Sequence, residues 1–229
     1  MNYLIKSFRD FTKLDLLIWI GSVVVLIISF AASGGGDVMT LIASLIGVTS
    51  LIFIAKGNVI GQFMVILFAV AYSIISFTFH YYGEMVTYLC MTAPSALATA
   101  IVWIRNPYSE TQVIVGEVSW KGWALLSAAT AAVTIAFYFI LAALETPNLF
   151  FSTISVTTSF LAAGLMFLRS QYYALGYMAN DMILVVLWIL ASIEDISYLP
   201  MVVNFAIFFI NDLYGYISWS RMKKVQNTE

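Results

Sequence analysis

Two asparagine–aspartate pairs interrupt stretches of sequence that are otherwise apolar. Asn180 and Asp181 lie within 172–192, and Asn211 and Asp212 lie within 198–219. An aspartate at the centre of a membrane span costs about 2.5–3.5 kcal/mol on insertion scales, so it is normally turned inward and paired, or functional. These groups predict a lined cavity for a polar ligand, although either aspartate can equally be structural and hydrogen-bonded to neighbouring helices.

Aromatic and polar side chains accompany the two pairs at helical spacing. The further candidate residues are Trp188, Asn204 and Tyr214 in the second half of the chain and Gln62, Tyr72, Tyr88 and Ser95 in the first half. Aromatic rings can stack on a flat ligand, and carboxylates favour positive charge. No lysine or arginine lies within any apolar stretch, so a phosphate would have nothing to neutralise it. The pattern predicts a site for a flat, polar, neutral or cationic molecule, whereas the serine and threonine stripes are more typical of helix packing.

Enzyme chemistry and resident cofactors are not expected. Cys90 and His80 are the single cysteine and the single histidine, which leaves a histidine-based metal or haem site without ligands and offers no nucleophile–base pair. A retinal photoreceptor needs a lysine inside its last span, and none is present there. We therefore expect no catalytic residues, no metal and no cofactor.

The composition is that of an integral membrane protein. Of the 229 residues, 62% are hydrophobic and 10% are charged, whereas a soluble domain carries about 25% charged residues. A helical span needs about 20 apolar residues, and eight segments qualify: 14–32, 38–55, 59–79, 85–104, 122–143, 149–168, 172–192 and 198–219. The expected fold is therefore all-α and polytopic, with a peripheral first helix.

The distribution of charge tests this number of spans. With eight spans, all ten lysines and arginines fall on one side, and the opposite loops hold only the acids Asp37, Glu84, Glu145, Glu194 and Asp195. The positive-inside rule then places both termini in the cytoplasm.

An internal repeat appears when the chain is compared with itself at a shift of 116 residues. The shift pairs Tyr72 with Trp188, and it pairs Trp103-x-Arg105 with Trp219-x-Arg221. This predicts two parallel three-helix repeats joined by one helix, with a site near the midplane between them. The predicted parts are 1–37 (cytoplasmic N-terminus and peripheral first helix), 38–105 (first repeat), 106–148 (cytoplasmic loop and linker helix), 149–220 (second repeat) and 221–229 (cytoplasmic tail). Trp103 and Trp219 end their spans and are expected to be interface anchors.

Three stretches carry a resemblance to a known family. YYALGYMANDMILVVLW in the seventh span, SYLPMV at the entry to the eighth, and INDLYGYISW within it together resemble the PnuC family of bacterial vitamin transporters. The resemblance is clearest over 165–224, and the three-one-three repeat extends it to 38–224. It implies a fold like that of full-length SWEET sugar transporters and a multi-pass protein of the bacterial inner membrane.

The resemblance also implies a substrate and a mechanism. The family's named substrate is nicotinamide riboside, a pyridinium cation that bears a carboxamide and a ribose, and related subfamilies carry thiamine or riboflavin. Transport would be facilitated diffusion, with trapping by a cytoplasmic riboside kinase. The binding residues that it implies in the matching stretches are Asn180, Asp181, Trp188, Asn204, Asn211, Asp212 and Tyr214, with Trp188 stacking on the pyridinium. A SWEET-type sugar transporter, proton relay by the two aspartates and a homo-oligomer all remain open.

Overall fold

The computed structural model describes residues 2–32, 38–78, 82–194 and 196–228, so Asp37, His80 and Asp195 lie outside the described residues. Eight helical segments in this part are long and apolar enough to cross a membrane, which confirms the predicted number of spans. They are α2 (Lys13–Ala32), α3 (Val38–Ala55), α4 (Ile60–Thr78), the continuous α5 (Tyr82–Thr87), η1 (Tyr88–Thr92) and α6 (Ala93–Arg105), then α7 (Trp120–Ala143), α8 (Leu149–Phe167), α9 (Tyr173–Glu194) and α10 (Leu199–Gln226). Two short helices, α1 (Asn2–Arg9) and η2 (Ile196–Tyr198), complete the described elements.

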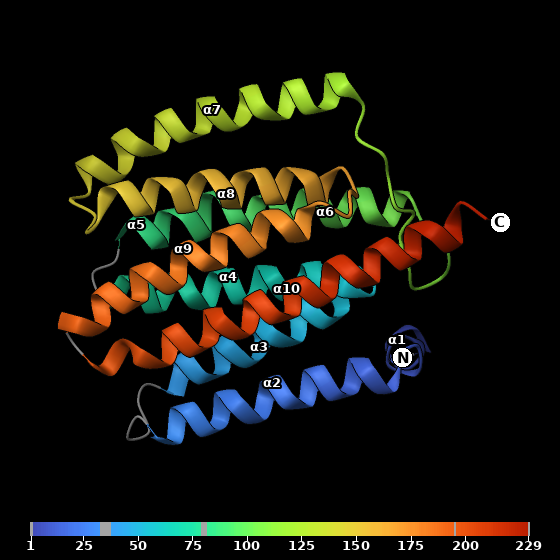
Figure 1. The fold of residues 1–229 in the computed structure, drawn as a ribbon, viewed down its shortest axis with the longest axis horizontal. Coiled ribbons are helices and arrows are strands. Elements are labelled where there is room, and N and C mark those ends of the chain that lie inside the picture. Colours follow the sequence, from blue (N-terminus) through green and yellow to red (C-terminus); the bar gives the residue numbers. More distant parts are fainter. Residues whose placement is uncertain (1, 33–37, 79–81, 195, 229) are drawn as a thin grey trace.

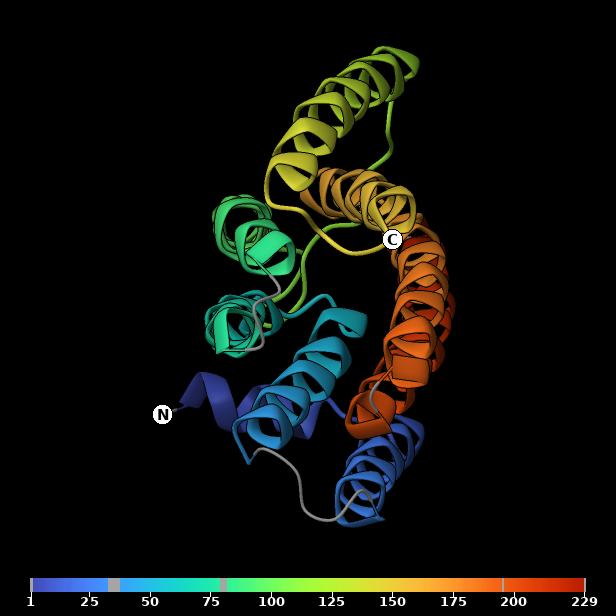
Figure 2. The same ribbon diagram turned by 90° about the vertical axis from the view of Figure 1, so that its left-hand side faces the viewer.

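Six of the long segments form a closed ring when the bundle is viewed end-on (Figure 2). Along the chain, α3 packs on α4 and α4 on α6, and likewise α8 packs on α9 and α9 on α10. The ring closes because α6 packs on α8 and α10 packs on α3, so the third helix of each set meets the first helix of the other set. The two sets therefore contact each other in a reciprocal manner.

The remaining two long helices lie outside the ring at opposite edges of the bundle (Figure 1). Helix α7 contacts α8, and α2 contacts α3 and α10. Both present most of their apolar side chains outward, as spans facing lipid do. The first span is thus peripheral, and α7 is a linker between the two sets.

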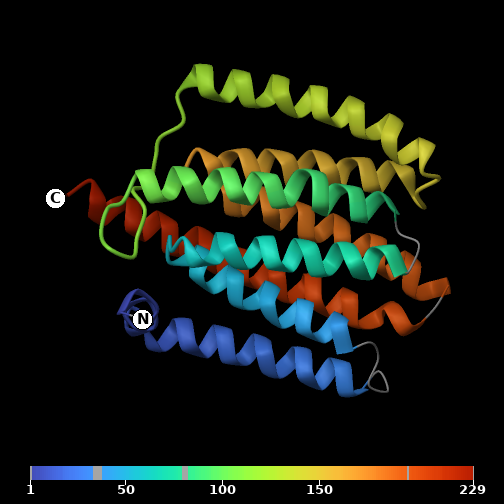
Figure 3. The same cartoon turned by 180° about the vertical axis from the view of Figure 1, so that it is seen from behind.

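Both chain ends lie at the same end of the bundle, together with the connection between α6 and α7 (Figures 1 and 3). An even number of spans requires this arrangement. The basic residues of the intervening connections, including Lys56 and Arg169, belong to this same end. We refer to it as the basic end and to the opposite end as the outer end.

Two tryptophans at the basic end are core residues rather than interface anchors, which corrects the prediction for Trp103 and Trp219. Both are buried, and their rings are 5.4 Å apart. The Trp103 indole N–H donates to the carbonyl of Met166 in α8 at 3.2 Å, and that of Trp219 donates to the carbonyl of Ile54 in α3 at 2.8 Å. Each tryptophan satisfies its polar atom by joining one helix set to the other, which a lipid-facing position would not allow.

The peripheral helix α2 is attached to the ring by a buried carboxylate. Thr12 and Asp15 form a reciprocal helix cap, in which the Thr12 N–H donates to Asp15 at 2.6 Å and the Asp15 N–H donates to the Thr12 hydroxyl at 3.2 Å. Asp15 also pairs with the Lys56 ammonium at 3.0 Å and accepts a hydrogen bond from the Tyr214 hydroxyl. The network fixes α2 against the α3–α4 turn and α10.

A single π-helical turn interrupts the fourth span. The Ala93 N–H donates to the carbonyl of Tyr88, five residues earlier, instead of to the residue four before it. Pro94 follows at once, and its missing N–H cannot continue the regular ladder at this point. Such turns occur often at functional sites. Here, the turn contains Tyr88 and Thr92, both of which line the cavity described next.

Candidate substrate-binding site

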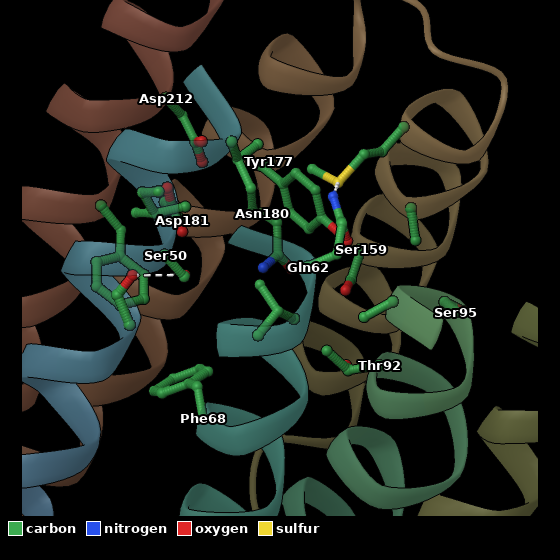
Figure 4. Close-up of a pocket in the computed structure, with 18 of the residues that line it drawn as sticks. Ser50, Gln62, Phe68, Thr92, Ser95, Ser159, Tyr177, Asn180, Asp181 and Asp212 are labelled. Atoms are coloured by element: carbon green, nitrogen blue, oxygen red, sulfur yellow. Dashed lines mark hydrogen bonds between the residues drawn. The ribbon is translucent and has the colours of Figure 1, made fainter. Parts of the chain in front are cut away.

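A cavity lies inside the ring, with about 730 Å³ of empty space when its opening to solvent is included. All six ring segments contribute to its wall, whereas α2 and α7 contribute none of the described lining residues. Figure 4 shows the labelled polar side chains converging on this space from α3, α4, α6, α8, α9 and α10. The ring is thus built around the cavity.

The amide of Asn180 is held in one orientation by the neighbouring helix. Its Oδ1 accepts hydrogen bonds from the hydroxyls of Ser155 at 3.0 Å and Thr158 at 3.2 Å, both on α8. The Nδ2 donor is thereby turned away from α8, and Asn180 is among the residues that line the cavity. A carbonyl or hydroxyl oxygen of a ligand is a suitable acceptor for it.

Asp181 on α9 and Asp212 on α10 give the cavity its charge. Both side chains are almost fully buried, and both line the wall of the cavity. No lysine, arginine or histidine is among the described residues that line the cavity. A ligand with a positive charge would offset the two acids, and an anionic ligand would meet only repulsion.

Aromatic rings form the wall toward the outer end. Phe68, Tyr88, Phe205 and Phe208 line the cavity, and successive ring centroids in this group are 5.6–5.9 Å apart. Tyr72 packs behind them, with its ring 4.4 Å from that of Tyr88. These five residues, which we call the aromatic cluster, offer flat surfaces to a planar ligand.

The shift of 116 residues recurs in the cavity wall. Five pairs of lining residues are separated by this number: Gly47 and Ala163, Ser50 and Met166, Val65 and Asp181, Thr92 and Phe208, and Ala96 and Asp212. In two of these pairs the first set has a small or apolar residue where the second set has an aspartate. Both acids therefore come from the second set, and the cavity is chemically one-sided.

Six of the eleven predicted binding residues line the central cavity, and five do not. Gln62, Tyr88, Ser95, Asn180, Asp181 and Asp212 belong to the wall. Tyr72, Trp188, Asn204, Asn211 and Tyr214 lie elsewhere, for reasons that follow from helix geometry.

Trp188 is on the same face of α9 as Asp181 but lies about 10 Å further along the helix. It lines a second hollow of about 560 Å³ at the outer end, together with Glu84, Glu194, Asn148 and Ser152. The same helices line both spaces, because α5–η1 carries Glu84 and Tyr88 while α8 carries Ser152 and Ser159. We call this second space the outer hollow.

Two predicted residues of α10 attach the peripheral helix instead. The Asn211 amide donates to the Ser22 hydroxyl of α2 at 3.0 Å, and the Tyr214 hydroxyl donates to Asp15 of α2. Because adjacent helical residues are rotated by about 100°, Asn211 and Asp212 face different neighbours. Asn204 is buried in the core, and its Oδ1 has no hydrogen-bond partner among the described residues.

Several lining residues were absent from the predicted set. The most informative are Gly47, Phe68, Thr92, Ser159 and Tyr177. Tyr177 lies one helical turn before Asp181, and Thr92 lies one turn after Tyr88, so helical spacing could have found both. Gly47 carries no side-chain signal, and its place in the wall depends on the approach of Phe68 and Phe208.

Both the sequence and the fold of this chain are similar to those of known proteins. Residues 37–221 match the family model described as nicotinamide mononucleotide transporter. The chain belongs to this transporter family. Two similar proteins are the nicotinamide riboside transporters PnuC of Neisseria mucosa, 25% identical over 80% of this chain and 72% of the relative, and of Haemophilus influenzae, 23% identical over 82% of each chain.

A solved structure shares the fold. The crystal structure of the vitamin B3 transporter PnuC superposes with a TM-score of 0.84, covers 99% of both chains and is 20% identical. Family membership and the eight spans identify the chain as a multi-pass bacterial membrane transporter and not an enzyme.

Proposed function

We propose that this chain carries nicotinamide riboside across the bacterial inner membrane and binds it in the central cavity. One observation carries this proposal: the cavity combines two carboxyl groups, an oriented amide donor and aromatic walls, with no basic residue among the described lining. Nicotinamide riboside has a cationic pyridinium ring, a carboxamide and ribose hydroxyls, and each of these finds a suitable partner there. The names of the two similar transporters support the same substrate.

In this proposal, the riboside is preferred over its mononucleotide. A phosphate would add negative charge beside Asp181 and Asp212 with no cation to bind it. The basic residues lie in the connections or near the ends of helices, and none is among the described residues that line the cavity. A cytoplasmic kinase that phosphorylates the riboside would therefore trap it inside the cell, and facilitated diffusion would suffice for net uptake.

Alternating access would use the two layers that close the cavity. At the basic end, the packed pair Trp103 and Trp219 lies next to the lining residues Ile54 and Met166, to which their indoles are hydrogen-bonded. Toward the outer end, four residues of the aromatic cluster line the cavity, and we propose that the cluster closes the cavity on that side. We propose that the two helix sets, arranged as in full-length SWEET transporters, rock about the site and open these layers in turn, with both termini in the cytoplasm.

The outer hollow is the proposed entry route. Its two carboxylates, Glu84 and Glu194, would attract a cation, and the Trp188 indole offers a stacking surface. The polar side chains of α5 and α8 continue from this hollow to the cavity. Trp188 would thus act in capture, while the aromatic cluster stacks on the substrate in the central site.

Uptake by proteoliposomes tests the proposal. Purified protein should accumulate labelled nicotinamide riboside until the concentrations on both sides are equal, and unlabelled riboside should compete. Thiamine, riboflavin and glucose should not compete at the same concentration. Competition by glucose without uptake of the riboside would instead favour a SWEET-type sugar transporter, and competition by one of the other vitamins would reassign the substrate within the vitamin class. Chemical cross-linking in the same liposomes would show whether the chain works as a homo-oligomer.

A further inference from the structure

The short helix α1 lies crosswise to the spans at the basic end. Figure 1 shows it end-on while the long helices run across the view, and Figure 2 shows its N-terminal end at the edge of the bundle. Its rotation about its own axis is fixed by Asn58 in the α3–α4 turn, whose amide donates to the Ser7 hydroxyl at 2.8 Å. Ser7 is buried, and Ile5, two residues earlier, points to the opposite side because adjacent helical residues are rotated by about 100°. One side of α1 therefore faces the protein, and the other side faces away from it.

Three apolar side chains of α1 are exposed. Leu4, Ile5 and Phe8 leave 53%, 56% and 46% of their surface accessible. The Phe8 ring is 5.3 Å from that of Phe53 in α3 and 6.3 Å from that of Trp19 in α2. Because Trp19 lies about 9 Å inside α2, Phe8 points from α1 toward the membrane-spanning part of the bundle. Leu4, one helical turn before Phe8, shares this face, so the exposed apolar side of α1 is directed toward the depth of the acyl chains.

Basic side chains lie next to this apolar side. Arg9 is exposed and lies one turn after Ile5, and Lys13 is the exposed first residue of α2. Neither has an ion pair among the described residues, whereas Lys6 pairs with Glu110 at 2.5 Å. Two basic groups are therefore available to an anion at the edge of the bundle.

The surface beside Arg9 is hollowed, and the wall of the hollow consists of Ile5, Lys6, Arg9 and Asp10. The acid in this wall, Asp10, accepts a hydrogen bond from the Thr111 hydroxyl at 2.6 Å. An anionic group in the hollow would meet Arg9 with the apolar Ile5 beside it. A free phosphate gains nothing from an apolar neighbour, whereas a phospholipid brings both a phosphate and acyl chains.

We propose that α1 is an interfacial helix that binds anionic phospholipid at the membrane surface of the basic end. Leu4 and Ile5 lie among the acyl chains, and Arg9 and Lys13 contact the phosphate groups. Amphipathic helices with this division of side chains lie in the plane of the interface, and their basic residues add attraction to anionic lipid. The proposal goes beyond the proposed function and does not depend on which substrate is carried.

Native mass spectrometry of the full-length protein measures the affinity for the first bound lipid, with dioleoylphosphatidylglycerol as the anionic probe and dioleoylphosphatidylcholine as the neutral one. We expect tighter binding of the anionic lipid, weakened about fivefold by Arg9→Gln and about 25-fold by Arg9→Gln combined with Lys13→Gln. The matched control, Lys121→Gln, removes an exposed base from the start of α7 at the opposite edge of the bundle and should bind like the wild type. Equal binding of the two lipids, an equal loss in Arg9→Gln and Lys121→Gln, or displacement of the lipid by excess inorganic phosphate would overturn the proposal.

Spin labels give an independent readout of depth. Leu4→Cys and Arg9→Cys are each labelled in the full-length protein with Cys90→Ser, in liposomes that contain phosphatidylglycerol; both positions are exposed, so neither label should disturb the fold. The label at Leu4 should collide more often with oxygen, which concentrates in the bilayer, and the label at Arg9 more often with a water-soluble nickel chelate. Equal access of the nickel chelate to both labels would show that α1 lies in water and would overturn the proposal.

Discussion

Gly47 is the position where the smallest change in the cavity wall should have the clearest effect. A Cβ atom at this glycine would lie 2.7 Å from Cζ of Phe208 and 3.2 Å from two ring carbons of Phe68. Carbon atoms normally pack at about 3.5–4.0 Å, so Phe208 must move by about 1 Å and Phe68 by a few tenths of an ångström. Both rings line the cavity, and their movement would take up space that the substrate needs.

We therefore expect Gly47→Ala to weaken binding of nicotinamide riboside about tenfold, which corresponds to about 1.4 kcal/mol. The matched control is Gly21→Ala on α2, because a Cβ atom there has nothing within 4 Å. Titration calorimetry measures both affinities, and melting in detergent shows whether each variant is folded. A folded Gly47→Ala that binds as tightly as Gly21→Ala would refute the placement of the substrate against Phe68 and Phe208.

Three further predictions separate the roles of buried polar and aromatic residues. Asn180→Ala should weaken riboside binding by about 10- to 100-fold, because the oriented amide donor is lost. Asn211→Ala should lower the melting temperature but leave the affinity within about twofold, because the Asn211 amide binds α2. Equal effects of the two variants on affinity would contradict the assignment of Asn180 to the binding site and Asn211 to the attachment of α2. Lys56→Met should destabilise the protein by about 1–3 kcal/mol, because the fully buried carboxylate of Asp15 loses its cation. The control, Lys121→Met, changes an exposed residue and should melt like the wild type. Identical melting curves for Lys56→Met and the wild type would show that the ion pair of Lys56 with Asp15 does not stabilise the protein. Trp188→Ala should slow initial uptake yet leave the dissociation constant within about twofold, since the indole lies in the outer hollow; a large loss of equilibrium affinity would place Trp188 in the binding site itself.

The number of spans and the peripheral first helix were accessible from sequence because both depend on hydropathy and the distribution of charge. The apolar stretches and their polar breaks give eight spans, and the structure confirms them. The short helix α1 and the π-helical turn at Tyr88–Thr92 were not predicted. The turn depends on how Pro94 is accommodated within a long span, which composition does not show.

The site was predicted in part, for a reason of helix geometry. Asn180, Asp181 and Asp212 were found because a buried acid or amide in a span requires an explanation. Asn211 and Tyr214 are also polar residues at membrane depth, but their partners lie on α2, and sequence alone does not show which neighbour a polar face meets. Trp188 shares a face with Asp181 at a different depth, so periodicity could not distinguish the cavity from the outer hollow.

Calorimetric comparison of nicotinamide riboside with its mononucleotide tests the central claim most directly. The two ligands share the pyridinium ring, the carboxamide and the ribose and differ only in the phosphate, which the acidic cavity should reject. We predict measurable binding of the riboside and binding of the mononucleotide that is weaker by about 100-fold or more, since a buried anion would be left without a partner. Equal or tighter binding of the mononucleotide would contradict the assignment of the riboside to this cavity.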